Sequence, residues 1–163
     1  MKIRFTIHGN SKDPAGNPVP YKRLIRGSFR RGDSDYLEWQ EYVRARFYRT
    51  AELILTENDL DPRVELPDIL IDRDAGNIVG LRQAGHGVEE KPINIPGYLM
   101  QLDLDIRFKD GHHGDPDNVF KSIADALFVQ DKNLYGTFPI PQPSTRGSPG
   151  RVDAVLTITN RKQ

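Results

Sequence analysis

Residues 98–108, YLMQLDLDIRF, constrain the fold of this chain more than any other segment. Apolar and polar side chains alternate along it, and the apolar set is Met100, Leu102, Leu104, Ile106 and Phe108. Because successive side chains of a strand point to opposite faces, the alternation predicts a strand with one face in a core and the other in water. Such a strand must lie in a sheet whose apolar face is covered by other elements.

Two other segments share this alternation. Residues 2–8, KIRFTIH, and residues 151–159, RVDAVLTIT, are predicted to be strands. Residues 58–97 are acidic, and we interpret them as an accessory excursion from the domain. Within them, Ala75-Gly76-Asn77 predicts the turn of a hairpin.

Two segments with helical spacing supply the covering elements. Residues 35–57 predict a long amphipathic helix with Ser34 or Asp35 as N-cap, and residues 116–128 predict a shorter helix. On the long helix, a solvated face is expected for Arg44, Arg46 and Arg49. We therefore expect the α/β class, of the α+β type: a small mixed β-sheet packed by two main helices in a single domain over residues 1–163.

Composition narrows the class of protein further. The chain contains no cysteine, which excludes disulfides, thiolate nucleophiles and cysteine-ligated zinc, and fits a reducing cytosol. No apolar run approaches the roughly 20 residues of a membrane span, and the first residues lack the apolar core of a secretory signal. We expect a cytoplasmic protein that makes no use of a membrane.

Charge is unevenly distributed, although the formal net charge is zero. Residues 1–50 contain 11 Lys and Arg against 5 Asp and Glu, whereas residues 51–110 contain 6 against 13. Interleaved with Tyr21 and Phe29 is a basic cluster consisting of Lys22, Arg23, Arg26, Arg30 and Arg31. Such a cluster suits contact with the phosphates and bases of DNA, and a solvated basic loop is the alternative.

Residues 114–132, GDPDNVFKSIADALFVQDK, contain the strongest local signal for a helix start. Asp115 predicts the N-cap, and Pro116 suits the first helical position. Asp117 then lies in the first turn, where the helix dipole favours a negative charge.

The same stretch gathers acids around one lysine. Asp117, Lys121 and Asp125 step by four residues, so they share a helix face, and a solvated ladder of salt bridges would explain them. That explanation leaves Asp131, which follows an apolar run, without a role. The alternative is a magnesium site, because Mg²⁺ prefers hard oxygen ligands such as the carboxylates of Asp115, Asp117 and Asp131. A nearby lysine would stabilise the charge that develops on a phosphodiester.

The segments DPDNVFKSIADAL and VQDKNLYG resemble the signature of RusA-type Holliday-junction resolvases. That signature is Asp-x-Asp-Asn, a lysine three residues later, Asp-Ala-Leu, and then an acidic residue before a strand. The resemblance is specific over residues 115–135, and the flanking strands agree in order. This chain has Gln130-Asp131 where the family usually has two acidic residues, and a shorter link before them.

The resemblance implies an Mg²⁺-dependent homodimeric endonuclease, with Mn²⁺ as a substitute, that cuts paired strands of a four-way DNA junction in recombination and repair. The family's metal-binding acids are matched by Asp115, Asp117 and Asp131, and its catalytic lysine is matched by Lys121. Asn118 and Asp125 match motif positions for which we expect supporting hydrogen bonds.

Two other interpretations belong to different classes. A non-catalytic dimer that binds branched DNA would need the basic cluster but no acid cluster. A small-molecule phosphatase of the haloacid-dehalogenase type would use Asp103 and Asp105, although both lie in the middle of a predicted strand. His112 and His113, in a glycine-flanked loop, are expected to be exposed rather than to bind a metal.

Overall fold

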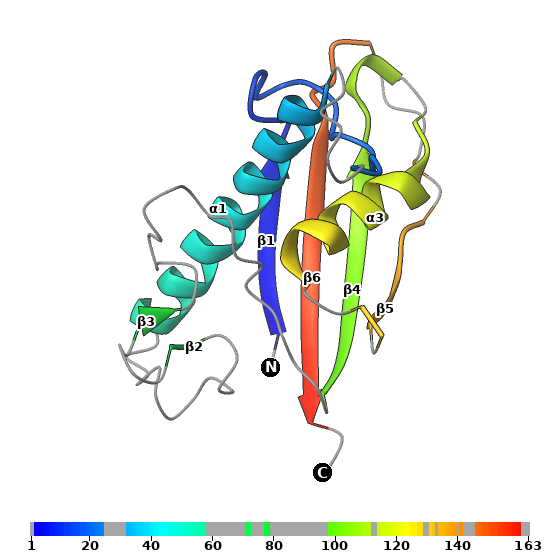
Figure 1. The fold of residues 1–163 in the computed structure, drawn as a ribbon. Helices are drawn as coiled ribbons and strands as arrows, with labels where there is room; N and C mark the ends of the chain where they lie inside the picture. The colour runs from blue at the N-terminus through cyan, green and yellow to red at the C-terminus, as the bar shows by residue number, and fades with distance from the viewer. Residues whose placement is uncertain are drawn as a thin grey trace.

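Four strands form a mixed sheet in the order β1-β6-β4-β5 in the computed structural model (Figure 1). They are β1 (Lys2–His8), β4 (Tyr98–Arg107), β5 (Leu134–Thr137) and β6 (Arg151–Asn160). Strand β6 runs antiparallel to both of its neighbours, whereas β5 runs parallel to β4. A parallel pair requires a crossover connection, and helix α3 (Pro116–Leu127) lies in that connection.

The structure describes residues 2–24, 32–57, 71–72, 77–78, 98–111, 114–128, 131–132, 134–139, 141 and 146–160. Within the excursion, the described part is an antiparallel hairpin of β2 (Ile71–Asp72) and β3 (Asn77–Ile78). The antiparallel pairing that the predicted hairpin requires is therefore confirmed, although Asn77, expected in the turn, lies in β3 and pairs with Asp72. Among the described helices, none has the length and apolar character needed to cross a membrane.

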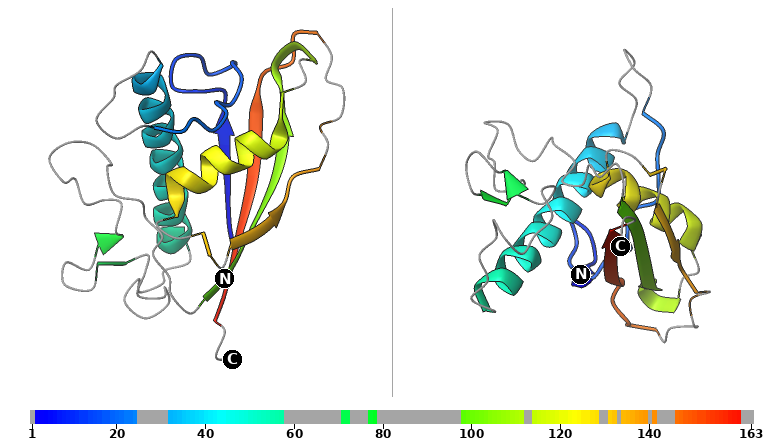
Figure 2. Two further views of the ribbon diagram at one scale, coloured as in Figure 1. Left: turned by 45° about the vertical axis from the view of Figure 1, so that its right-hand side comes forward. Right: turned by 90° about the horizontal axis from the view of Figure 1, so that it is seen from below.

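Helices α1 (Asp33–Glu57) and α3 cover the same face of the sheet (Figures 1 and 2). The expected α+β architecture, a small mixed sheet packed by two main helices, is confirmed. The expected N-cap of α1 at Ser34 or Asp35 is wrong. The helix begins earlier because the backbone N–H of Tyr36 already donates to the carbonyl of Gly32, at 3.2 Å.

The core lies between the helices and the alternating strands. Its strand residues come from β1, β4 and β6, and they are Ile3, Phe5, Ile7, Met100, Leu102, Leu104, Ile106, Val152, Ala154 and Leu156. Helix α1 adds Tyr36, Trp39, Val43 and Phe47, and α3 adds Val119, Ile123, Ala126 and Leu127. Burying one large aliphatic or aromatic side chain contributes about 1.5–3 kcal/mol, so these matched rows fix how the helices sit on the sheet.

Polar bonds also join the two helices. The indole Nε1 of Trp39 donates to Ser122 Oγ at 3.1 Å, and Nε of Arg44 donates to the carbonyl of Ala126 at 2.7 Å. The prediction that Arg44 lies on a solvated face is therefore wrong, since its residue is only 5% exposed. Position 44 lies eight residues after the buried Tyr36, so it falls on the same side of the helix and faces α3.

Candidate functional site

Asp115 is the N-cap of α3, as the sequence predicts, and Pro116 opens the helix. One carboxylate oxygen of Asp115 accepts from the backbone N–H of Asp117 at 3.0 Å. The other accepts from the side-chain amide of Asn118 at 3.1 Å. Two bonds from separate donors therefore orient a carboxylate that is exposed at the positive end of a helix.

Asp117 and Lys121 form an ion pair on the next turn of α3. The Asp117 Oδ2 to Lys121 Nζ distance is 3.1 Å, and the side chains are 48% and 54% exposed. An exposed pair of this kind contributes only about 0–1 kcal/mol to stability. Breaking this ion pair therefore costs the fold little, and each of the two charged groups can then bind a ligand instead.

Asp125 does not continue this pair into a ladder. Its Oδ2 accepts from the hydroxyl of Tyr36 at 2.8 Å and from the side-chain amide of Gln40 at 2.7 Å, so the residue ties α3 to α1. Burial, together with the hydrogen bond to Asp125, raises the pKa of the Tyr36 hydroxyl far above its ordinary value. Although the three residues are spaced four apart, Asp117 and Lys121 lie in solvent, whereas Asp125 lies at the interface between α3 and α1.

A groove of about 340 Å³ lies beside Asp115. Its lining comes from the loop after β1, the end of β4 and the start of α3, and consists of Asn17, Pro18, Pro20, Phe108, Gly114, Asp115 and Val119. The backbone N–H of Tyr21 donates to the carbonyl of Asn118 at 2.9 Å, which holds the loop against α3. The capped carboxylate therefore borders a concave surface.

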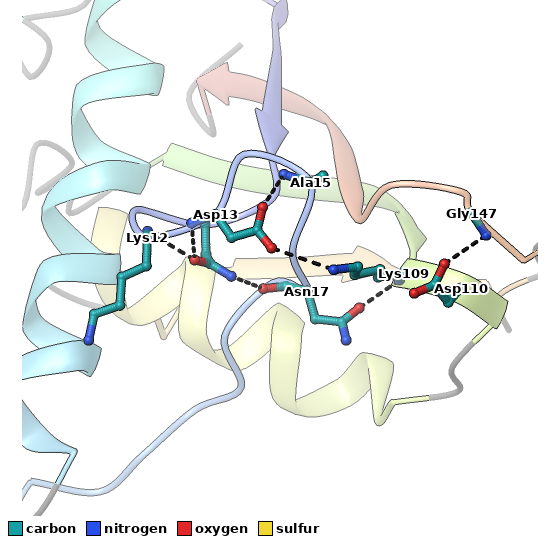
Figure 3. A network of polar contacts seen from close by, with 8 residues as sticks. Lys12, Asp13, Ala15, Asn17, Lys109, Asp110 and Gly147 are labelled. Carbon is teal, nitrogen blue, oxygen red and sulfur yellow. Dashed lines mark hydrogen bonds and ion pairs between the residues drawn. The ribbon is translucent and has the colours of Figure 1, made fainter.

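Three segments meet at Asn17, Lys109 and Asp110 (Figure 3), and Asn17 also lines the groove. The Asn17 side-chain oxygen accepts from the backbone N–H of Lys109 at 2.6 Å, and Lys109 Nζ approaches a carboxylate oxygen of Asp13 at 3.6 Å. Asp110, in the short turn η2 (Lys109–Gly111), accepts from the N–H of Gly147 at 2.7 Å. The loop after β1, the turn after β4 and the loop before β6 thus form one connected edge of the site.

Asp131 lies apart from Asp115. The carbonyl of Asp131 accepts from the N–H of Leu134, which pairs with Met100 near the beginning of β4. Asp115, in contrast, lines its groove with Phe108, just after the end of β4. Met100 and Phe108 are eight residues apart along this extended segment, or about 26 Å at 3.3 Å per residue. In the described part of the chain, no three His, Cys, Asp or Glu side chains gather closely enough to hold one metal ion.

The basic cluster is only partly described. Lys22 Nζ pairs with Oδ1 of the buried Asp33 at 2.7 Å, so its charge already serves the start of α1. Arg23 is exposed. The remaining predicted DNA contacts and the paired histidines lie outside the described residues, and they are Arg26, Arg30, Arg31, His112 and His113.

Asp103 and Asp105 lie on the face of the sheet opposite the helices. Asp103 accepts from the side chains of Gln101 and Thr137, the latter at 2.8 Å. Asp105 is exposed beside Arg107, at 3.9 Å. Neither borders the groove at α3. The partners of Asp103 are side chains on the same face of the sheet, so its hydrogen bonds have a structural role.

Sequence reasoning missed the partners of Asp125 and a second concave surface. Tyr36 and Gln40 lie four residues apart and thus face the same way, but nothing local shows that α3 packs against them. The second surface includes Arg46 and Arg49, whose spacing of three was visible in the sequence.

Comparison with known proteins adds no family to this description. No family model matches the chain, and a search of curated proteins found no match. The resemblance to the resolvases therefore depends on the motif over residues 115–135.

Proposed function

We propose that the chain is a divalent-metal-dependent endonuclease that acts on branched DNA. The observation that carries the proposal is that Asp115, Asp117 and Lys121 lie together on the exposed first turns of α3, beside a groove. A helix start needs one capping side chain, and Asp115 provides it. Asp117 and Lys121 add an exposed carboxylate and an exposed ammonium group, whose ion pair contributes little to stability.

The donor set suits Mg²⁺ without a third acid. Mg²⁺ is commonly bound through one or two protein carboxylates, with waters and substrate phosphate completing its shell. Asp115 and Asp117 would hold the ion, and their hard oxygens also suit Mn²⁺. Such an ion supplies an activated water and neutralises charge on the phosphate. Because Asp131 lies at the other end of β4, its predicted role as a ligand gains no support from its position.

The chain's own groups would position the substrate. The start of α3 would present the positive end of the helix dipole to a phosphate. Lys121 would turn from Asp117 to the phosphate and stabilise the negative charge that grows on it. The hydrogen bond from Asn118 would keep the Asp115 carboxylate in a fixed orientation.

The substrate class and the assembly follow from the resemblance. A four-way junction has two equivalent strands to cut, so a homodimer with a two-fold axis would present two equivalent sites to it. The proposed biological setting is DNA recombination and repair in the cytoplasm.

The test is cleavage of an end-labelled synthetic four-way junction with Mg²⁺ or Mn²⁺, beside a linear duplex and an EDTA control. Paired cuts in the junction alone, abolished by EDTA and by Asp117→Asn, are expected. Asp105→Asn is the matched control, because it removes an exposed carboxylate from the other face of the sheet. Unaltered cutting by Asp117→Asn, or its loss in Asp105→Asn alone, would overturn the assignment.

The separation of Asp131 from Asp115 favours one second candidate, a protein that binds branched DNA without cutting it. In that case the junction is bound at all metal concentrations and stays intact. Asp117→Asn would then leave the affinity unchanged or raise it, because one negative charge near the phosphates is removed.

A further inference from the structure

A second groove, of about 510 Å³, lies where α1 passes the edge strand β1. Arg4 and His8 border it from β1, and Arg46 and Arg49 border it from α1. It is larger than the groove beside Asp115, and no residue of the nuclease motif lines it. The positive charge of three arginines in one concave surface favours the binding of an anionic ligand.

The edge of β1 faces this groove. The N–H of Gly9 donates to the carbonyl of Gly150, in register with the pairing of β1 and β6, so the peptide groups of His8 point the other way. The carbonyl of His8 accepts accordingly from the hydroxyl of Tyr42 on α1, at 2.6 Å. Arg4, four residues earlier, also presents its peptide groups to this open edge. A cationic side chain on this edge opposes pairing with another strand, as charged residues on edge strands do.

The positive charge of the groove is not neutralised by its one acid. Asp153 accepts from Arg151 Nε at 3.0 Å and from Thr6 Oγ1 at 2.8 Å, both within the sheet. Partial burial raises the pKa of Asp153, but the bonds from Arg151 and Thr6 outweigh it, so the pKa is lowered. Arg4 and Arg49 form no ion pair with an acidic residue in the described part of the chain. Their charges are therefore available to a ligand.

Arg46, which also lines the groove, is held in place by Tyr42. Its guanidinium lies 5.2 Å from the centre of the Tyr42 ring, and its Nη2 is 3.5 Å from the Tyr42 hydroxyl. The same hydroxyl is fixed by its bond to His8. A stacked guanidinium keeps donors for a phosphate while losing little conformational freedom.

We propose that this groove binds the phosphate backbone of DNA, as a contact surface separate from α3; the inference rests on the proposed function for the identity of the polyanion. Arg4 and Arg49 are exposed and come from two elements. Exposed arginines along a groove suit a run of phosphates, and they position the DNA without reading its sequence.

The test measures binding of a fluorescent four-way junction without divalent metal, at several salt concentrations. The variant carries Arg4→Gln and Arg49→Gln, and Arg107→Gln is the control because Arg107 is exposed on β4 and does not line the groove. The slope of log affinity against log salt should become less steep by about 1 for each groove arginine removed. An unchanged slope, or an equal change in the control, would overturn the inference.

Failure of the inference and failure of the proposed function give different results. If the wild type cuts the junction and the double variant binds with the wild-type slope, only the groove assignment fails. If the slope depends on Arg4 and Arg49 but the junction is never cut, the chemistry fails and the groove stands. Displacement of the junction by poly-glutamate as readily as by unlabelled duplex would assign the groove to acidic protein and overturn it for DNA. Circular dichroism melts would verify that the double variant is folded.

Discussion

At the scale of single residues, Asp115 has one role in the fold and a second in the proposed chemistry, and substitution separates them. Asparagine caps a helix about as well as aspartate, whereas alanine costs about 0.5–2 kcal/mol. We expect Asp115→Asn to retain wild-type stability in urea unfolding, and Asp115→Ala to lose about 1 kcal/mol. Both should abolish junction cleavage. If Asn is as destabilising as Ala, the charge and not the capping bond stabilises α3.

The hydrogen bond between Tyr36 and Asp125 gives a second prediction. Tyr36→Phe removes the hydroxyl that donates to the Asp125 carboxylate and keeps the bond from the side-chain amide of Gln40. A hydrogen bond to a charged group contributes about 1.5–3 kcal/mol, so we expect a loss near that size in the free energy of unfolding at neutral pH. Gln40→Ala is the matched variant on the same carboxylate. A loss below about 0.5 kcal/mol would show that water replaces the hydroxyl.

Tyr36 also predicts a pH dependence. The pKa of its hydroxyl is raised in the folded protein above the ordinary value of 10.0. Above about pH 10 the unfolded chain therefore loses a proton that the folded protein retains. The stability that Tyr36 contributes is complete below this pH and falls as the pH rises further. The difference in unfolding free energy between wild type and Tyr36→Phe should shrink above about pH 10, and a constant difference would contradict it.

At the scale of elements, β5 depends on the absence of a side chain at Gly136. A Cβ there would lie 1.8 Å from the backbone oxygen of Leu102, in the neighbouring strand β4. Because a backbone atom cannot rotate away, Gly136→Ala must push β5 from β4, and we expect a loss of about 3 kcal/mol, the upper end for overpacking. Gly147→Ala is the comparison, since no atom lies within 4 Å of a Cβ there and only its φ of +91° opposes it. Equal losses in thermal unfolding would contradict this explanation.

The elements differ in how far local sequence determines them. The alternation in β4 and the cap at Asp115 predicted those elements because each depends on neighbours in sequence. Arg44 was misplaced because its partner, the carbonyl of Ala126, belongs to another helix. Asp33 was missed as part of α1 because its stabilising partner Lys22 lies on the preceding loop. Local pattern predicts an element, while its exact start and its polar contacts depend on what packs against it.

At the scale of the whole molecule, the candidate site divides in the same way. Asp115, Asp117 and Lys121 lie within two turns of one helix, so their proximity followed from spacing alone. Asp131 follows that helix closely in sequence, yet the parallel crossover carries it to the far end of β4. The groove arginines Arg4 and Arg49 come together only because α1 passes the edge of β1. The sequence alone does not show which distant segments come together in the fold.

The last prediction concerns the edge of the candidate site, where the loop after β1, the turn after β4 and the loop before β6 meet. Asn17 joins the loop after β1 to the turn after β4, since its side-chain oxygen accepts from the N–H of Lys109, while its carbonyl accepts from Asn10 within its own loop. Asn17→Ala leaves the Lys109 N–H without its partner, and we expect a loss of about 1–2 kcal/mol with faster amide exchange at that residue. Asn17→Asp keeps an acceptor oxygen in the same place and should restore protection.

If the edge also positions Asp115, Asn17→Ala should slow junction cleavage while Asn17→Asp restores it. The loop that carries Asn17 lines the groove with Asp115, so loosening the loop widens the groove without removing a carboxylate. Hydrogen exchange at Lys109 and cleavage rate would then change together across the three proteins. A cleavage rate that stays constant while exchange accelerates would show that the edge stabilises the fold and plays no part in holding the site.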